Sequence, residues 1–219
     1  MSDPEFVLGP NDDLAGAVDV LRSGGFVLLP SDTAYSVAAL PLSGAVRTRI
    51  NTLLRRRDMP VSLAFPDIAV ADRWIAANPV ARRLLRRFCP GPVTVVCTAA
   101  PGLPDQLFEQ AVASRNRTVG VRVPDSAPER RVAAATEYPV TTVAVIGPDG
   151  RIATSLAEAI TIIQHGLAEA GFQRWCAIDG KVTGGNLSTV IEVVGDQVEL
   201  IRLGAIPFKH LQEVAAGHE

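Results

Sequence analysis

Polar side chains that directly follow a short apolar run form the segment best suited to chemistry. Residues 26–29 read Phe-Val-Leu-Leu, and residues 30–35 read Pro-Ser-Asp-Thr-Ala-Tyr. A buried strand fixes the groups at its end, so hydroxyls and a carboxylate there can build a small-molecule site. An ordinary Pro-Ser-Asp turn gives the same pattern. The candidates in this segment are Ser31, Asp32, Thr33 and Tyr35.

Arg122 is a second candidate because it interrupts an apolar strand. The strand is predicted at 118–123, and strand periodicity places Gly120 and Arg122 on one face. A guanidinium buried in such a strand needs an anionic partner. Two partners stay open: a phosphate-bearing ligand, or a structural ion pair with Asp32 or Asp179.

The cationic side chains are almost all arginines, because Lys181 and Lys209 are the only lysines. Arginine binds phosphate through two parallel hydrogen bonds. The arginines at 82–87 alternate with apolar residues at helical spacing, which is typical of the solvated face of an amphipathic helix. Two other groups of arginines lie at 47–57 and 115–122.

Composition and missing motifs exclude several classes of protein. The chain has 219 residues, of which 47% are hydrophobic and 20% charged, as in one globular domain. Its net charge of -2 provides no general attraction to nucleic acid. Walker, dinucleotide-binding and nucleophile-elbow motifs do not occur, which argues against the common nucleotide folds and hydrolases.

Cysteine and histidine usage predicts no metal centre, and the chain shows no targeting segment. The three cysteines (Cys89, Cys97 and Cys176) lack metal-ligand and disulfide spacing and are interpreted as reduced, buried thiols. No signal-peptide core or membrane-spanning apolar stretch is found. We therefore expect a cytoplasmic protein.

Helical periodicity and turn residues predict alternating elements. Helices are predicted at 11–22, 43–56 with Ser43 as N-cap, 68–76, from Asn78-Pro79 to a stop at Pro90, 127–135, 155–170 and 207–216. Strands are predicted at 26–29, 60–65, 93–98, 118–123, 140–146, 176–179, 188–194 and 197–202. Residues 101–116 form a loop-rich excursion. The alternation predicts an α/β domain with a largely buried mixed sheet.

Six short segments, in the same order, carry a resemblance to a known family. They are 29–35 (Leu-Pro-Ser-Asp-Thr-Ala-Tyr), 55–62 (Arg-Arg-Arg-Asp-Met-Pro-Val-Ser), 88–94 (Phe-Cys-Pro-Gly-Pro-Val-Thr), 118–125 (Thr-Val-Gly-Val-Arg-Val-Pro-Asp), 187–191 (Leu-Ser-Thr-Val-Ile) and 202–206 (Arg-Leu-Gly-Ala-Ile). Together they resemble the YrdC-like family, which includes the threonylcarbamoyl-AMP synthases. The match runs from about residue 12 to 210.

The resemblance implies one YrdC-like domain at 12–210, with an extension at 1–11 and a tail at 211–219. The implied fold is α/β, with a twisted mixed parallel and antiparallel sheet flanked by helices around a deep basic cavity. The implied activity makes threonylcarbamoyl-AMP from threonine, bicarbonate and ATP, with release of pyrophosphate. The product serves threonylcarbamoyladenosine formation on tRNA. Magnesium is expected only with ATP, and weak RNA binding and tRNA-modification partners are further expectations.

The resemblance also assigns roles to residues of this chain. Nucleotide- or phosphate-binding positions fall on Arg55, Arg122, Thr142, Ser188 and Arg202. Positions that orient a small amino acid and its ammonium group fall on Ser31, Asp32, Thr33 and Tyr35. No residue is assigned as catalytic. For Ser188 the alternative explanation is simple β-propensity. For Asp32, Thr33 and Tyr35 the alternative is a capped turn with a core tyrosine.

The chain departs from the family pattern where polar contacts to ATP are expected. A family lysine falls on Leu53, and a serine and an asparagine fall on Val143 and Val145. Arg56 and Arg57 are candidates to replace the lysine. Loss of one preorganised donor costs about 2.7–4 kcal/mol of transition-state stabilisation, and such losses add imperfectly.

Three hypotheses follow from the sequence. The first is an ATP-dependent carbamoyl-adenylate synthase, which the retained arginines and hydroxyls favour. The second is a related protein that binds nucleotide or double-stranded RNA without making the adenylate, which Leu53 and the two valines favour. The third is a domain with no ligand site, in which Arg122 serves only stability.

Overall fold

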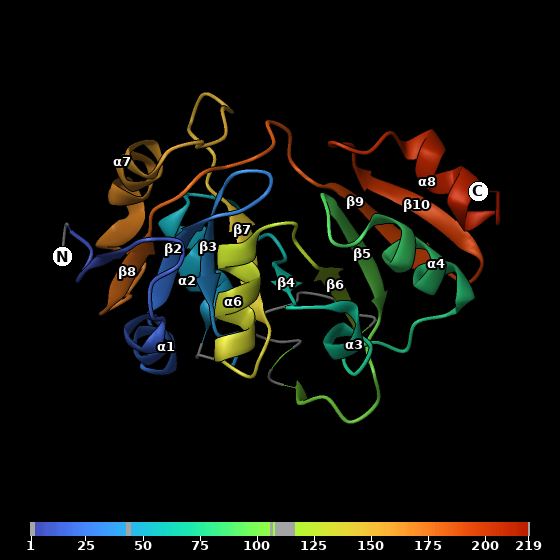
Figure 1. Ribbon diagram of the computed structural model, residues 1–219, viewed down its shortest axis with the longest axis horizontal. Helices are drawn as coiled ribbons and strands as arrows, with labels where there is room; N and C mark the ends of the chain where they lie inside the picture. The colour runs from blue at the N-terminus through green and yellow to red at the C-terminus, as the bar shows by residue number, and fades with distance from the viewer. Residues whose placement is uncertain (1–2, 43–44, 106, 108–116, 219) are drawn as a thin grey trace.

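In the computed structural model the described residues are 3–42, 45–105, 107 and 117–218. Their strands form one mixed sheet in the order β1-β8-β2-β3-β7-β4-β6-β5-β9-β10 (Figure 1). The pairs β1–β8, β2–β8, β4–β6 and β5–β9 are parallel, and the others are antiparallel. The strands are β1 (Val7–Leu8), β2 (Phe26–Pro30), β3 (Tyr35–Ala39), β4 (Ser62–Ala64), β5 (Val93–Thr98), β6 (Thr118–Arg122), β7 (Val140–Ala144), β8 (Trp175–Ile178), β9 (Thr189–Val194) and β10 (Gln197–Arg202).

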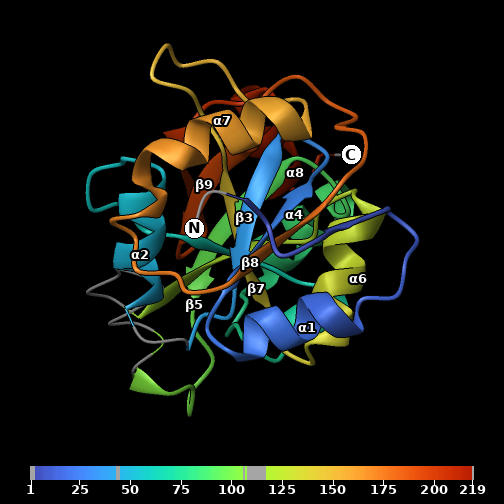
Figure 2. The ribbon, with the colours of Figure 1, turned by 90° about the vertical axis from the view of Figure 1, so that its left-hand side faces the viewer.

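Strand β2 is buried on both faces, as its continuous apolar run predicts. Phe26 and Leu28 pack in one apolar cluster with residues of α2 (Val46–Leu53) and α7 (Leu156–Leu167). Val27 and Leu29 pack in a second cluster with residues of α1 (Ala15–Arg22) and α6 (Ala127–Ala135). Figure 2 shows α7 and α1 on opposite sides of the strands. This part of the sheet is therefore a buried layer between helices.

The other end of the sheet is covered by α4 (Pro79–Phe88) and α8 (Phe208–Ala215), which pack on each other and on β5 and β10 (Figure 1). Local signals explain where the helices begin. Asn78 accepts a hydrogen bond from the Ala81 N–H, so it caps α4 as predicted. Ser155 and Glu158 form a capping box at the start of α7.

The structure adds two strands to the predicted set. Tyr35–Ala39 is strand β3, which pairs antiparallel with β2. The Ser31 N–H donates to the Ala34 carbonyl at 2.9 Å and closes the hairpin loop. Strand β1, inside the predicted extension at 1–11, pairs with β8, and α8 continues past the predicted boundary at 210. The hairpin of β2 and β3 holds the polar segment 31–34 at both ends.

Most of the predicted helices are shorter in the structure, and for two of them a local contact explains the difference. The helix predicted at 68–76 ends at Ala71 as α3 (Ile68–Ala71). The prediction is wrong beyond that residue, because Ile75 forms a β-bridge with Ala99. The first helix begins at Ala15 instead of Asn11, because Asp12 accepts the Gly9 N–H and holds a turn. The predicted cap Ser43 and most of the 101–116 excursion lie outside the described residues.

Among the described residues no helix is both long and apolar enough to cross a membrane.

Candidate functional site

A cavity of about 1110 Å³ lies over the middle strands of the sheet. Alternate residues of β5, β6 and β9 line it, as strand periodicity requires, and three consecutive residues of β7 (Thr142, Val143 and Ala144) also border it. Many of these side chains are small and polar, and together they leave the space open: Ser62, Thr94, Thr118, Gly120, Thr142 and Ser188. The loop after α2 and one face of α7 complete the wall. Drug-sized ligands occupy pockets of roughly 300–1,000 Å³, so a nucleotide fits this volume.

Arg122 borders the cavity but is already neutralised. Its guanidinium forms an ion pair with Asp32 and donates to Thr33 Oγ1 at 3.1 Å. Both partners of the ion pair are buried. Asp32 also accepts the Asp125 N–H at 3.2 Å. The structure thus contains the structural pair that the sequence left open as an alternative. A phosphate-binding role for Arg122 stays a prediction.

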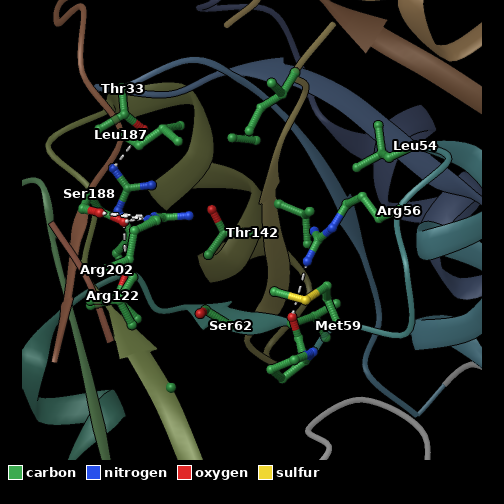
Figure 3. Close-up of a pocket in the computed structure, with 18 of the residues that line it drawn as sticks. Thr33, Leu54, Arg56, Met59, Ser62, Arg122, Thr142, Leu187, Ser188 and Arg202 are labelled. Carbon is green, nitrogen blue, oxygen red and sulfur yellow. Dashed lines mark hydrogen bonds between the residues drawn. The ribbon is translucent and has the colours of Figure 1, made fainter. Parts of the chain in front are cut away.

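Arg202 lies beside Arg122 on the same side of the cavity (Figure 3). Its Nη2 donates to the Ser188 carbonyl oxygen at 2.9 Å and to Ser188 Oγ at 3.0 Å. No described carboxylate lies within 4.0 Å of its guanidinium, so its partners are neutral. Partial desolvation and the Arg122 charge lower the pKa of Arg202. This cation therefore has capacity for an anion.

The arginine that faces Arg202 is Arg56. Figure 3 shows it across the cavity from Arg122 and Arg202, with Thr142 between the two sides. Its Nη2 donates to the Pro60 carbonyl oxygen in a long contact of 3.4 Å. Burial and the charge of Arg202 lower the pKa of Arg56. Arg56 and Arg202 thus repel each other across the same space.

Arg55 borders the cavity, but its guanidinium does not reach toward Arg202. It binds the His165 carbonyl oxygen near the end of α7, with Nε at 3.0 Å. The backbone of Arg55 has a φ of 49°, in the left-handed region. Arg55 lies beyond the end of α2 at Leu53, and Arg56 is less exposed than Arg55. Spacing within the triple arginine could not distinguish these positions.

The amino-acid candidates divide into three environments. Thr33 borders the cavity. Ser31 and Asp32 are buried behind it, in the hairpin loop. Tyr35 is fully buried, and its hydroxyl accepts the Gly180 N–H at 3.0 Å and lies 3.0 Å from Asp179 Oδ1. Burial raises the pKa of Tyr35 to about 12. Tyr35 fastens the hairpin to the loop after β8, as the core-tyrosine alternative predicts.

The apolar departures from the family pattern occupy different places. Leu53 and Val145 are fully buried in the core. Leu54 and Val143 border the cavity. The position expected to carry a lysine is thus a core residue, and the neighbouring Leu54 supplies apolar wall. Thr142 also borders the cavity, and its buried Oγ1 makes no hydrogen bond of good geometry with the part of the chain that the structure describes.

Sequence analysis missed Glu129, a carboxylic acid on α6 with 0% exposure. It lies in very close hydrogen-bond contact with the Ser31 hydroxyl. Its place in the first turn of a helix, after Pro128, is typical of an exposed acid, so no local signal identified it.

Comparisons with known proteins agree on the fold and the family. The Sua5/YciO/YrdC model, described as telomere recombination, matches residues 19–204. A Methanocaldococcus jannaschii protein, whose name proposes a threonylcarbamoyl-AMP synthase, is 27% identical over 193 residues, which cover 87% of this chain and 85% of that protein.

Two solved structures are similar in fold. The structure of E. coli YciO has a TM-score of 0.77 at 22% identity and covers 94% of this chain and 98% of its own. The structure of P. abyssi Sua5 complexed with L-threonine has a TM-score of 0.73 at 24% identity. That match covers 95% of this chain, which spans only 60% of the Sua5 chain.

Proposed function

The chain belongs to the Sua5/YciO/YrdC family, and from that premise we propose that its cavity binds ATP and a small amino acid and forms a carbamoyl-adenylate. The observation that supports this proposal is the pair of arginines, Arg56 and Arg202, that face one cavity without a described carboxylate partner. A guanidinium is always charged, and two of them in one partly desolvated space favour a multiply charged anion.

The proposed reaction has two bond-forming steps. The amine of the amino acid adds to bicarbonate and water leaves, which gives a carbamate. A carbamate oxygen then attacks the α-phosphate of ATP, the bond to the β-phosphate breaks, and pyrophosphate leaves. Such phosphoryl chemistry depends mainly on positioning and on cations that offset developing charge. Magnesium would enter with the triphosphate.

Five residues that border the cavity have a part in this proposal. Arg56 and Arg202 bind the phosphates from opposite sides. The hydroxyls of Thr142 and Ser188 donate hydrogen bonds to phosphate oxygens. Thr33, held beside Arg122, contacts the amino acid. The threonine-bound Sua5 structure and the name of the Methanocaldococcus jannaschii relative support threonine as the amino acid.

The test is pyrophosphate release from ATP, bicarbonate, magnesium and a panel of amino acids. We expect release that depends on the amino acid, with threonine the best, and that is lost in Arg202→Ala. Arg57→Ala is the matched control, because Arg57 is exposed and does not border this cavity. Folded wild-type protein that releases no pyrophosphate with any amino acid contradicts the synthase.

A second candidate function is nucleotide binding without synthesis, and the apolar wall at Leu54 and Val143 favours it. This version predicts saturable binding of a non-hydrolysable ATP analogue together with no pyrophosphate release. Binding of double-stranded RNA by exposed arginines would weaken steeply with salt. RNA binding that is absent, or that does not change with salt, removes that version.

A further inference from the structure

A fully buried acidic side chain, Glu129, has no part in the proposed reaction. Glu129 is fully buried, and it shares the inner face of α6 with Val132 and Ala133. Residues three and four positions apart lie on one helix face, so the apolar packing of this face carries the carboxyl inward. A carboxylate without a cation of its own is costly in such a place.

The hydrogen bonds around Ser31 require a proton that the usual ionisation states do not supply. Ser31 Oγ lies 2.9 Å from Asp32 Oδ1 and in closer contact with Glu129 Oε2. A hydroxyl has one proton to donate. Asp32 pairs with Arg122 and accepts the Asp125 N–H, so it is the ionised acid. If Glu129 were also ionised, the carboxylates of Asp32 and Glu129 would compete for the one hydroxyl proton of Ser31. Arg122 would then be the one nearby cation to balance two negative charges.

A proton on Glu129 removes this conflict. Glu129 Oε2 then donates to Ser31 Oγ, and Ser31 donates to Asp32 Oδ1. Each hydrogen bond from Glu129 through Ser31 to Asp32 then has one donor and one acceptor. The buried cluster holds one positive charge, on Arg122, and one negative charge, on Asp32. This arrangement leaves the other oxygen, Oε1, on the side of Thr142, and Oε1 makes no hydrogen bond of good geometry with any residue that the structure describes.

We propose that Glu129 is a neutral carboxylic acid and a positioning residue, whose proton directs the Ser31 hydroxyl to Asp32 and so fixes the Asp32–Arg122 pair at the edge of the cavity. The residue touches no ligand. It acts through Ser31 and Asp32 on Arg122, and it lies behind Thr142, which borders the cavity. An ionised Glu129 would add negative charge behind the site that is proposed to bind phosphate.

The surroundings of Glu129 agree with a neutral acid. Burial raises its pKa, and Arg122, the Ser31 hydroxyl and the Thr142 hydroxyl only partly oppose that rise. The charged groups that face it are Arg122 on β6 and Asp32 in the hairpin loop. Strands β2 and β4, which also pack on α6, carry no charged residue. On α1, Asp19 is paired with Arg174.

The pH profile of stability tests the proposal. If Glu129 is neutral in the folded protein, unfolding releases its proton wherever the unfolded acid, with a pKa of about 4.3, is ionised. The folded pKa is raised, so the stabilisation by this proton is complete below the unfolded pKa and is lost as pH rises to the folded pKa. Over that window the ratio of the wild-type to the Glu129→Gln unfolding constants rises about tenfold per pH unit.

Unfolding in urea between pH 5 and 8 supplies this ratio, with Glu137→Gln as the control because Glu137 is exposed. A purely structural role gives a ratio that does not change with pH. A ratio that is flat above pH 5 therefore overturns the proposal. The infrared difference spectrum between wild type and Glu129→Gln is the second measurement. It should contain the carbonyl band of a protonated carboxylic acid at neutral pH, and its absence also contradicts the proposal.

The link to ligand binding rests on the proposed function and is tested separately. Affinity for a non-hydrolysable ATP analogue is measured below and above the pH at which Glu129 ionises. As the pH rises through this value, the affinity of the wild type should fall more than that of Glu129→Gln. Equal falls contradict the link. If neither protein binds the analogue, the proposed function fails, while the stability profile still decides the state of Glu129.

Discussion

Two neighbouring arginines, Arg122 and Arg202, line one cavity and differ in what balances their charge. Arg122 is buried and paired with Asp32, which itself accepts further hydrogen bonds. Arg202 is more exposed and donates only to neutral oxygens of Ser188. The first arginine builds the wall, and the second has capacity for a ligand. The difference teaches that the position of an arginine in a motif does not by itself indicate a binding role.

The largest expected effect concerns the paired arginine. Asp32→Ala leaves Arg122 buried without its anion, and removal of one partner of a buried ion pair costs about 3–5 kcal/mol. Urea unfolding measures this loss. Asp58→Ala is the matched control, because it removes an exposed aspartate from its pair with Arg47 and should cost about 0–1 kcal/mol. Equal losses in the two variants would show that Asp32–Arg122 is not a special pair.

The next effect concerns the arginines without a carboxylate partner. Arg202→Ala and Arg56→Ala each remove a charge-assisted contact worth about 1.5–3 kcal/mol, so affinity for a non-hydrolysable ATP analogue should fall about 10- to 100-fold. Their unfolding free energies should change by only about 0.5 kcal/mol. Calorimetric titration and urea unfolding check both statements. A variant that loses stability but keeps affinity would reverse the roles assigned to the two kinds of arginine.

A smaller effect sharpens the description of the apolar wall. Leu54→Lys places a further cation beside the cavity. Because Leu54 is only 7% exposed, the cost of desolvating the ammonium offsets much of its attraction to a bound anion, which leaves a net gain of about 0–1 kcal/mol. Affinity for the same analogue should therefore rise up to about fivefold. Leu54→Met keeps the wall apolar and should leave the affinity unchanged. If both variants behave alike, Leu54 does not face the bound anion.

The smallest effect appears only at high pH. Burial raises the pKa of Tyr35 to about 12, from about 10 in an unfolded chain. The protonated phenol is therefore favoured in the folded protein, so its stabilisation is complete below pH 10 and is lost as pH rises toward 12. Unfolding free energies of wild type and Tyr35→Phe should converge over that window. Parallel pH profiles would show that Tyr35 does not titrate with folding.

The sequence was sufficient for the fold because its signals are local and repeated. The Asn78 cap, the Ser155 capping box and the buried run of β2 are each visible in a few residues. Strand β3 was missed because Tyr-Ser-Val-Ala-Ala is short and lies next to a polar loop. The YrdC-like family, inferred from six short segments, is confirmed by the family model over residues 19–204.

The site was harder to predict because it depends on contacts between distant segments. Arg122 and Asp32 are 90 residues apart, and Arg55 and its partner His165 are 110 residues apart. Arg55, which has a left-handed backbone, binds the His165 carbonyl oxygen, whereas the adjacent Arg56 faces Arg202 across the cavity (Figure 3). The sequence does not distinguish these two arginines. Glu129 is hidden by tertiary packing and has no signature in its own helix. The motif residues Arg55, Arg122 and Arg202 all border the cavity. The sequence does not reveal that Arg122 is paired with a carboxylate, which only the structure shows.

The central claim, that Arg56 and Arg202 together hold a polyphosphate, is tested most directly by calorimetry with a non-hydrolysable ATP analogue. Wild type and Arg57→Ala should bind one molecule each, with affinity that falls as salt is added because the contacts are between charges. Arg56→Ala/Arg202→Ala, shown to be folded, should give no measurable binding. Wild-type affinity in that double variant would contradict the account.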